Sequence, residues 1–266
     1  MNPDIIQIAV LALIQGLTEF LPVSSSAHLI LVPRLLGWAD QGLAVDVAAH
    51  VGTLAAVVFY FRRELAAMLG QWFASGFSTR DHQSRYVWYL AVATLPVAVA
   101  GLLAGGLIET WLRSPLVLAW ASILFGLLLW WADARGLRQR SEAGLAWRDV
   151  IIIGLFQVLA LIPGTSRSGI TITAGLLLGF DREAASRFAF LLSIPVIILA
   201  GGYEFLKLLA SPAAVDWTGV VLVTVLSAVT AAITIHLFLK FLTRTGMLPY
   251  VVYRLILGVV LLYLFI

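Results

Sequence analysis

Residues 15–28 read QGLTEFLPVSSSAH, and they interrupt an apolar region that extends from residue 5 to residue 36. The interruption combines Pro22 with three consecutive serines, Ser24, Ser25 and Ser26. Proline disfavours helix at the residue before it, and serine side chains compete with the backbone for helical hydrogen bonds. We therefore expect two short helices that meet at a polar turn, each of about ten to fifteen residues and too short to cross a bilayer.

A second apolar region, residues 150–180, is interrupted in the same way by PGTSRSG at residues 163–169. In both regions a glutamine precedes the break, and LLGW at residues 35–38 is echoed by LLGF at residues 177–180. The offset is near 141 residues, and each region is followed by three long apolar windows. The sequence therefore predicts a single membrane domain, residues 1–266, made of two repeats at approximately 1–133 and 142–266.

The composition is that of an integral membrane protein. Of 266 residues, 61% are hydrophobic and only 12% are charged, with a mean hydropathy of +1.00; a soluble domain has about a quarter of its residues charged. These values exclude a soluble enzyme, and the absence of cysteine excludes a disulfide scaffold and a thiol nucleophile. Windows of transmembrane length lie at 47–62, 86–108, 114–132, 187–206, 217–240 and 250–266.

These features predict an all-α integral membrane fold with six transmembrane helices plus two interrupted re-entrant helical hairpins. Because three spanning helices follow each hairpin, the second copy must enter the membrane from the opposite side, which makes an inverted-topology repeat. The loops at 62–85, 133–149, 180–187 and 240–249 carry twelve arginines and lysines and should be cytoplasmic, whereas 109–113 and 204–216 carry only Arg113 and Lys207. Both termini would then be external, and the two polar turns could meet near the midplane.

Two ionisable residues stand alone in the interrupted regions, Glu19 in the first and Arg167 in the second. A charged side chain at membrane depth costs at least about 2.5–3.5 kcal/mol, so each indicates a functional site. Their simple neutralisation in a buried pair is the alternative. Hydroxyl-rich turns at helix N-termini, together with a guanidinium, suit phosphate oxygens. The residues that would bind a membrane-partitioning phosphate compound are Ser24, Ser26, Thr165, Ser166, Ser168 and Thr171.

The same stretches offer metal and nucleophile chemistry. Glu19 could hold a hard divalent cation, Mg²⁺ or Ca²⁺, through oxygen ligands. His28 follows Ser25 by three residues, about one helical turn, and could activate its hydroxyl. A cation-activated water and a phosphohistidine on His28 remain open alternatives. The net charge of +3 does not indicate a nucleic-acid partner, because the basic residues are dispersed between apolar windows.

Residues 15–28 and 163–169 resemble the two signature motifs of the undecaprenyl-diphosphate phosphatase family, which is associated with bacitracin resistance. The resemblance extends through Arg62-Arg63 and AASRFAFLL at 184–192 to essentially the whole chain. It implies a multi-pass hydrolase of the bacterial cytoplasmic (inner) membrane, and the loop charges predict that its active site faces the periplasm. Such an enzyme converts undecaprenyl diphosphate to the monophosphate and inorganic phosphate, recycling the lipid carrier of peptidoglycan synthesis.

The resemblance also implies residue roles. Glu19 would be the carboxylate of the metal or acid–base site, Ser25 the nucleophile or a phosphate ligand, His28 a catalytic imidazole, and Arg167 the diphosphate clamp. Many members carry a second glutamate where this chain has Gln15, so a two-carboxylate metal site is in doubt. An amide oxygen can still coordinate a cation, and Glu19 with Gln15 is the expected metal pair.

Two other classes compete with this interpretation. A secondary transporter would also use inverted repeats with broken helices, although it needs no dense cluster of Ser, His, Glu and Arg. A purely structural membrane subunit is the other rival, and a homodimer is compatible with the sequence. Asp46 and His50 are four residues apart and would share one side of a helix. They could lie at the edge of the outer cavity, but the pattern favours a solvated helix end.

Overall fold

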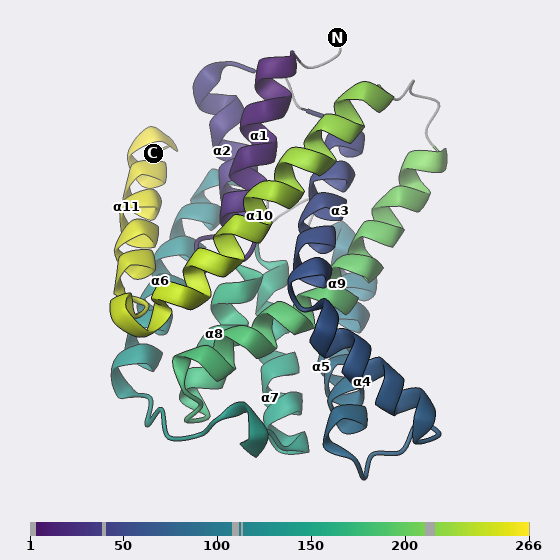
Figure 1. Cartoon of the computed structure of the whole chain (residues 1–266). Helices are drawn as coiled ribbons and strands as arrows, with labels where there is room; N and C mark the ends of the chain where they lie inside the picture. The colour runs from purple at the N-terminus through teal and green to yellow at the C-terminus, as the bar shows by residue number, and fades with distance from the viewer. Residues whose placement is uncertain (1–3, 39–40, 108–111, 113, 211–215, 266) are drawn as a thin grey trace.

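The computed structural model describes residues 4–38, 41–107, 112, 114–210 and 216–265, and the ordered elements in these ranges are helices (Figure 1). Six helices are long and apolar enough to cross a membrane. They are α3 (Leu43–Tyr60), α5 (His82–Leu107), α6 (Pro115–Arg135), α9 (Arg182–Ala210), α10 (Trp217–Thr245) and α11 (Leu248–Phe265). The predicted all-α membrane class and its six spanning windows are confirmed.

The observed long helices extend beyond several of the predicted windows. Helix α9 begins at Arg182 rather than near residue 187, because Asp181 precedes it and its carboxylate accepts a hydrogen bond of 2.7 Å from the Ala184 amide. Windows chosen by apolarity stop where charged residues become frequent. The helices themselves continue into the polar region, where capping side chains rather than lipid set their ends.

Each interrupted region folds as a pair of short helices. Helices α1 (Ile5–Thr18) and α2 (Ser25–Leu36) form the first pair, and α7 (Trp147–Val158), the short η3 (Leu159–Leu161) and α8 (Arg167–Leu177) form the second. The residue before each second helix has a positive φ, 72° at Ser24 and 69° at Ser166. Left-handed backbone ends the turn at both places and lets a new helix start in another direction.

The two helix pairs meet in the middle of the molecule. Figure 1 shows α1 and α2 in the upper half and α7 and α8 in the lower half, with the turns of the two pairs close together. The Ser168 hydroxyl of the second turn donates a 3.0 Å hydrogen bond to the Leu21 carbonyl of the first. Segments almost 150 residues apart in the sequence therefore share one central layer.

Close backbone packing holds α1 and α3 against α10. A Cβ atom at Gly52 would lie 2.4 Å from the Thr224 carbonyl oxygen, and one at Gly16 would lie 2.8 Å from the Ser227 carbonyl oxygen. Glycine is therefore required at both contacts, as is common where helices approach closely in membranes. This packing fixes the end of α1, and with it Glu19, relative to the long helices.

An additional helix, α4 (Arg62–Ala74), occupies part of the predicted basic loop at 62–85. It packs against α5, and Trp72 contacts the rings of Phe77 and Trp88 at centroid distances of 4.6 and 5.8 Å. The sequence did not predict this helix, because thirteen residues that begin with two arginines are neither long nor apolar enough to match a transmembrane window. Its length and charge are typical of a helix at a membrane surface.

The basic loops lie at the lower end in Figure 1, opposite the start of α1 and the end of α11, and ion pairs organise them. Arg182 contacts Asp133 at 2.6 Å, and Arg187 contacts both Glu64 and Glu142, at 2.5 and 3.1 Å. Arg140 binds Asp149 at 2.6 Å, and this hydrogen bond raises the pKa of the Arg140 guanidinium. Several of the arginines from which the topology was predicted therefore also connect the loops to the helices. Arg113, one of the two basic residues expected on the other side, lies outside the described residues.

Candidate active site

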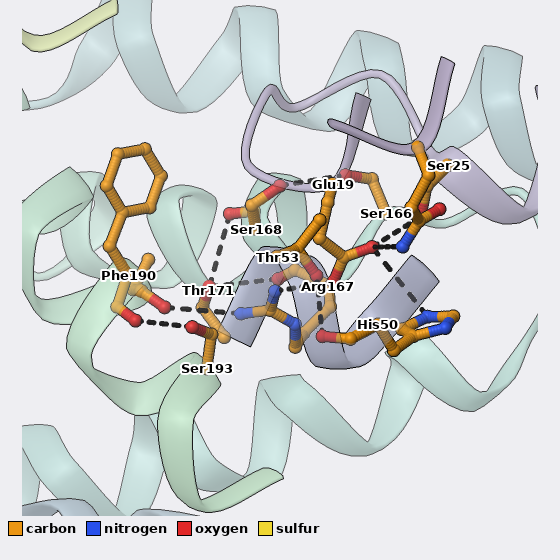
Figure 2. Close-up of polar contacts among 12 residues, drawn as sticks. Glu19, Ser25, His50, Thr53, Ser166, Arg167, Ser168, Thr171, Phe190 and Ser193 are labelled. Atoms are coloured by element: carbon orange, nitrogen blue, oxygen red, sulfur yellow. Dashed lines mark hydrogen bonds and ion pairs between the residues drawn. The ribbon is translucent and has the colours of Figure 1, made fainter. Parts of the chain in front are cut away.

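Glu19 lies in the turn between α1 and α2, and three side chains donate to its carboxylate. Arg167 Nη2 lies 2.9 Å from Oε1, while Ser25 Oγ and Gln15 Nε2 lie 2.7 and 3.0 Å from Oε2. Figure 2 shows Ser25 and Arg167, from the two different turns, directed at this one carboxylate. The structure thus brings together Gln15, Glu19, Ser25 and Arg167, four of the residues proposed for the site.

The Glu19–Arg167 pair is largely withdrawn from water. The Glu19 side chain is 8% exposed and the Arg167 side chain 13% exposed. Arg167 is the first residue of α8, and its Nη1 also donates weakly to the Ala189 carbonyl at 3.4 Å. A buried pair of this kind returns little net stability, because desolvation offsets most of the Coulomb attraction. The pair is therefore poorly explained as a purely stabilising contact.

A cavity of about 590 Å³ opens beside this pair. Its apolar wall comes from α2, the first half of α3 and the second half of α9, including Leu29, Val47 and Ile197. Its polar lining consists of Glu19, Ser24, Ser25, Ser26, Asp46, His50, Ser166, Arg167 and Glu204. A site with a charged floor and apolar walls suits an amphiphile whose head group is anionic.

Three of the predicted substrate-binding residues lie outside the lining. Ser168 donates to the Leu21 carbonyl, and Thr171 donates to the carbonyls of Arg167 and Ser168 at 2.9 and 3.1 Å. Thr165 is fully buried, and its hydroxyl has no hydrogen-bond partner in the described part of the chain. In this structure, Ser168 and Thr171 hold the backbone of the turns, whereas Ser24, Ser26 and Ser166 face the cavity.

His28 points away from the cavity. Its Nδ1 lies 2.7 Å from the Ser24 carbonyl oxygen, and its Nε2 makes a short hydrogen bond with the Tyr253 hydroxyl of α11. The two rings are stacked, with centroids 5.6 Å apart and planes 10° from parallel. The three-residue spacing to Ser25 predicted a contact between imidazole and hydroxyl. The helix instead aims His28 at the carbonyl four residues back, as the helical period favours.

A second imidazole, from His50, does face the site. His50 Nε2 lies 4.0 Å from Glu19 Oε2, and His50 Nδ1 lies 2.8 Å from the Asp46 carbonyl oxygen. Both Asp46 and His50 line the cavity, so they edge it rather than form only a solvated helix end. Their position four residues apart had indicated a cavity edge as one alternative, although the pattern favoured a solvated helix end.

Arg254 was not identified from the sequence. It lies within α11, is completely buried, and contacts backbone carbonyls of both turns. The criterion that indicated Glu19 and Arg167, an ionisable residue inside an apolar window, applies equally to Arg254. It was missed because the window 250–266 was treated only as a membrane span.

The donors around Glu19 fit a hard divalent cation in part. Gln15 Oε1 is buried without a hydrogen-bond partner in the described ranges, and it belongs to the side chain that already contacts Glu19. Carboxylate, amide and hydroxyl oxygens are ligands that Mg²⁺ and Ca²⁺ accept. The described residues contain no group of three His, Cys, Asp or Glu side chains suited to a metal. Substrate and water oxygens would have to complete the coordination.

Fold and site together define a class of protein: a helical integral membrane protein whose carboxylate, hydroxyl and guanidinium groups meet where two broken helix pairs converge. The family model described as "Bacitracin resistance protein BacA" matches residues 8–260, so the chain belongs to this family. The resemblance noted from residues 15–28 and 163–169 is thereby confirmed.

Curated relatives resemble the chain over nearly its whole length. The "Undecaprenyl-diphosphatase 2" of Stutzerimonas stutzeri (strain A1501) is 60% identical over 266 residues, which cover 98% of each chain. Proteins named "Undecaprenyl-diphosphatase" from Nitrosococcus oceani and Teredinibacter turnerae are each 56% identical, over 98% and 97% of this chain and 99% and 98% of their own. The similarity therefore covers both turns and all six long helices.

Proposed function

We propose that this protein is an undecaprenyl-diphosphate phosphatase, which hydrolyses undecaprenyl diphosphate to undecaprenyl phosphate and inorganic phosphate. The observation that carries the proposal is the Glu19–Ser25–Arg167 cluster at the floor of a cavity with apolar walls. The names of the relatives support the same substrate. The reaction recycles the lipid carrier for cell-wall synthesis and gives bacitracin resistance.

The cavity can bind both parts of the substrate, the anionic diphosphate and the apolar prenyl chain. Arg167 offers a planar guanidinium that can bind two phosphate oxygens, and α2 and α8 begin beside it, where the helix dipoles favour negative charge. Ser24, Ser26 and Ser166 add hydroxyl groups at the same place, and Ser168 and Thr171 support the turns through their hydrogen bonds to backbone carbonyls. The apolar wall would receive the start of the prenyl chain. A bound diphosphate would compete with Glu19 for the Arg167 guanidinium.

Ser25 is the nucleophile that the geometry favours. Its hydroxyl donates to Glu19 Oε2 at 2.7 Å, so the carboxylate can accept the proton as Oγ attacks the terminal phosphorus. The Ser25–phosphorus bond forms, the bond to the bridging oxygen breaks, and undecaprenyl phosphate leaves. Water then attacks the phosphoserine, inorganic phosphate departs, and Ser25 regains its proton. Direct attack by water remains the alternative, with Ser25 as a phosphate ligand only.

His28 takes a supporting role in this scheme, because its ring nitrogens contact Ser24 and Tyr253 rather than Ser25. A phosphohistidine intermediate would require the ring to turn out of both contacts. A divalent cation, Mg²⁺ or Ca²⁺, would be held by Glu19 and the Gln15 amide oxygen. When bound, it would neutralise charge on the diphosphate.

We infer that the protein lies in the bacterial cytoplasmic membrane with the cavity open to the periplasm. The cavity is lined by α2, the first half of α3 and the second half of α9, whereas the basic loops lie toward the lower end in Figure 1, and basic loops prefer the cytoplasm. In this arrangement both helix pairs are re-entrant. The matching positive φ values of Ser24 and Ser166 support the proposed duplication of residues 1–133 and 142–266. A homodimer is not required, because Gln15, Glu19, Ser25 and Arg167 come from one chain.

The test is phosphate release from a polyprenyl diphosphate by purified protein in detergent with a divalent cation. Arg167→Lys is the informative variant, because lysine replaces the two-pronged guanidinium by a point charge. We expect turnover to fall by at least about 10²-fold, the loss typical for a donor aimed at developing charge. Lipid uptake by vesicles without phosphate release would favour the transporter instead, and near-normal turnover of Arg167→Lys would remove the clamp role.

A further inference from the structure

Arg254 connects α11 to both turns through backbone carbonyls. Its Nη2 donates to the Gly164 carbonyl at 2.9 Å, in the second turn, and its Nη1 donates to the Pro22 carbonyl at 3.4 Å, in the first. The same guanidinium donates to the carbonyls of Ala121 and Ser122 of α6, at 3.3 and 3.2 Å. One side chain therefore joins two long helices and two turns.

The charge of Arg254 is not explained by an ion pair. The residue is completely buried, and no carboxylate in the described ranges forms a salt bridge with it. Arginine stays protonated in proteins, so the fold bears an unpaired cation in its interior. An apolar side chain of similar volume would avoid that cost. The hydrogen bonds of Arg254 with carbonyl groups must therefore do more than fill space in the interior.

The surroundings of Arg254 leave it little freedom to move. A Cβ atom at Gly126 would lie 3.2 Å from Arg254 Cβ, and one at Gly169 would lie 2.9 Å from Arg254 Nη1. Gly169 belongs to the first turn of α8, two residues after Arg167. The guanidinium thus lies directly behind the start of the helix that presents Arg167. It does not line the cavity, so it does not touch a ligand bound there.

We propose that Arg254 is a positioning residue for the phosphatase reaction, which fixes the first turn relative to the second so that Ser25 and Arg167 both reach Glu19. The proposal rests on the function proposed above. It explains why the guanidinium binds one carbonyl from each turn rather than a carboxylate. Errors of about 1 Å in the placement of reacting groups can lower rates about 10²-fold, so a contact remote from the substrate can control turnover.

Arg254→Lys tests the inference in the full-length protein. Lysine keeps the charge, but a single ammonium group cannot reach carbonyls on three separate segments. We expect kcat to fall at least tenfold while KM stays within about threefold, because Arg254 acts on the reacting groups and not on the bound lipid. Arg182→Lys is the matched control, since Arg182 is a partly buried arginine that pairs with the carboxylate of Asp133 and contacts neither turn in the described hydrogen bonds. Its kcat should stay close to that of the wild type.

Amide hydrogen exchange provides a readout that general destabilisation would not reproduce. In Arg254→Lys, the amides of residues 20–26 and 163–169 should exchange faster, while those of α3 and α10 keep their wild-type rates. Wild-type turnover in a monodisperse Arg254→Lys preparation would overturn the inference, and so would a lower kcat without faster exchange in the two turns. The two failures can be told apart: absence of phosphate release by the wild type contradicts the proposed function, whereas wild-type release together with unchanged turnover in Arg254→Lys contradicts only the positioning role of Arg254.

Discussion

At the scale of single residues, the site is a carboxylate surrounded by donors. Glu19 accepts from Gln15, Ser25 and Arg167, and His50 lies 4.0 Å away. The sequence identified Glu19, Ser25 and Arg167 because acidic, hydroxyl and guanidinium groups inside apolar stretches are costly and therefore conspicuous, whereas Gln15 was indicated by the family resemblance. It could not give the orientation of His28 or the approach of His50, because both depend on how α2 and α3 pack against other helices.

The role of Ser25 can be decided by one substitution. If Ser25 is the nucleophile, Ser25→Ala should lose turnover by several orders of magnitude and still bind lipid diphosphate. An acid-quenched phosphoenzyme of the wild type should then carry its phosphate on Ser25. A variant that keeps more than about a tenth of wild-type kcat has lost only about 1.4 kcal/mol, the value of one hydrogen bond, and the attacking group would be water.

The side chain at position 15 should determine how strongly the enzyme binds its divalent cation. Gln15→Glu adds a second carboxylate beside Glu19, and more negative charge strengthens the binding of a hard cation. We expect half-maximal activation at a lower Mg²⁺ or Ca²⁺ concentration than in the wild type. Gln15→Leu removes the buried amide oxygen and should shift activation to higher concentration. Identical cation dependence in all three proteins would place the cation elsewhere.

At the scale of elements, most of the helices could be predicted and their ends could not. Apolar windows identified the six spans, and the proline and serine breaks identified the two short helix pairs. Helix α4 was missed because it obtains its stability from packing on α5 rather than from its own apolar length. Contacts such as that of Gly52 with α10 are likewise invisible in the sequence, since glycines also occur in loops.

Gly52→Ala is the test of that packing. The added methyl group would meet the Thr224 carbonyl oxygen at 2.4 Å, and overpacking of this kind typically costs about 1–3 kcal/mol. The thermal unfolding midpoint in detergent should therefore fall. Gly70→Ala is the matched control, because Gly70 lies within α4 with no heavy atom within 4 Å of the added Cβ, and alanine favours helix there by about 1 kcal/mol. Equal midpoints for the two variants would contradict the packing argument.

At the scale of the whole molecule, the arrangement of charge gives a direction. The cavity is lined by residues of α2, the first half of α3 and the second half of α9, whereas Arg182, Arg187 and Arg140 form ion pairs with residues of the basic loops and α4. The sequence predicted this asymmetry from the loop charges alone. It could not predict that Arg254 joins the turns, because a contact across two halves of a chain depends on the finished fold.

Cysteine labelling tests the direction, since the chain has no native cysteine. Asp4→Cys, at the exposed start of α1, should react with an impermeant thiol reagent added to intact cells. Arg80→Cys and Arg138→Cys, in exposed parts of the basic loops, should react only after the membrane is opened. Wild-type phosphate release in each variant ensures that the fold is intact. The opposite labelling pattern would reverse the proposed orientation.

The contacts of Arg254 also have a consequence for biosynthesis. Pro22 is synthesised early and Arg254 late. During most of translation the Pro22 carbonyl therefore cannot form its hydrogen bond with the Arg254 guanidinium. Until α11 has been inserted, the two turns lack the guanidinium that fixes both of them to α6 and α11. A nascent or prematurely terminated polypeptide should therefore be catalytically silent, and phosphate release from cell membranes would report only on molecules whose synthesis had been completed.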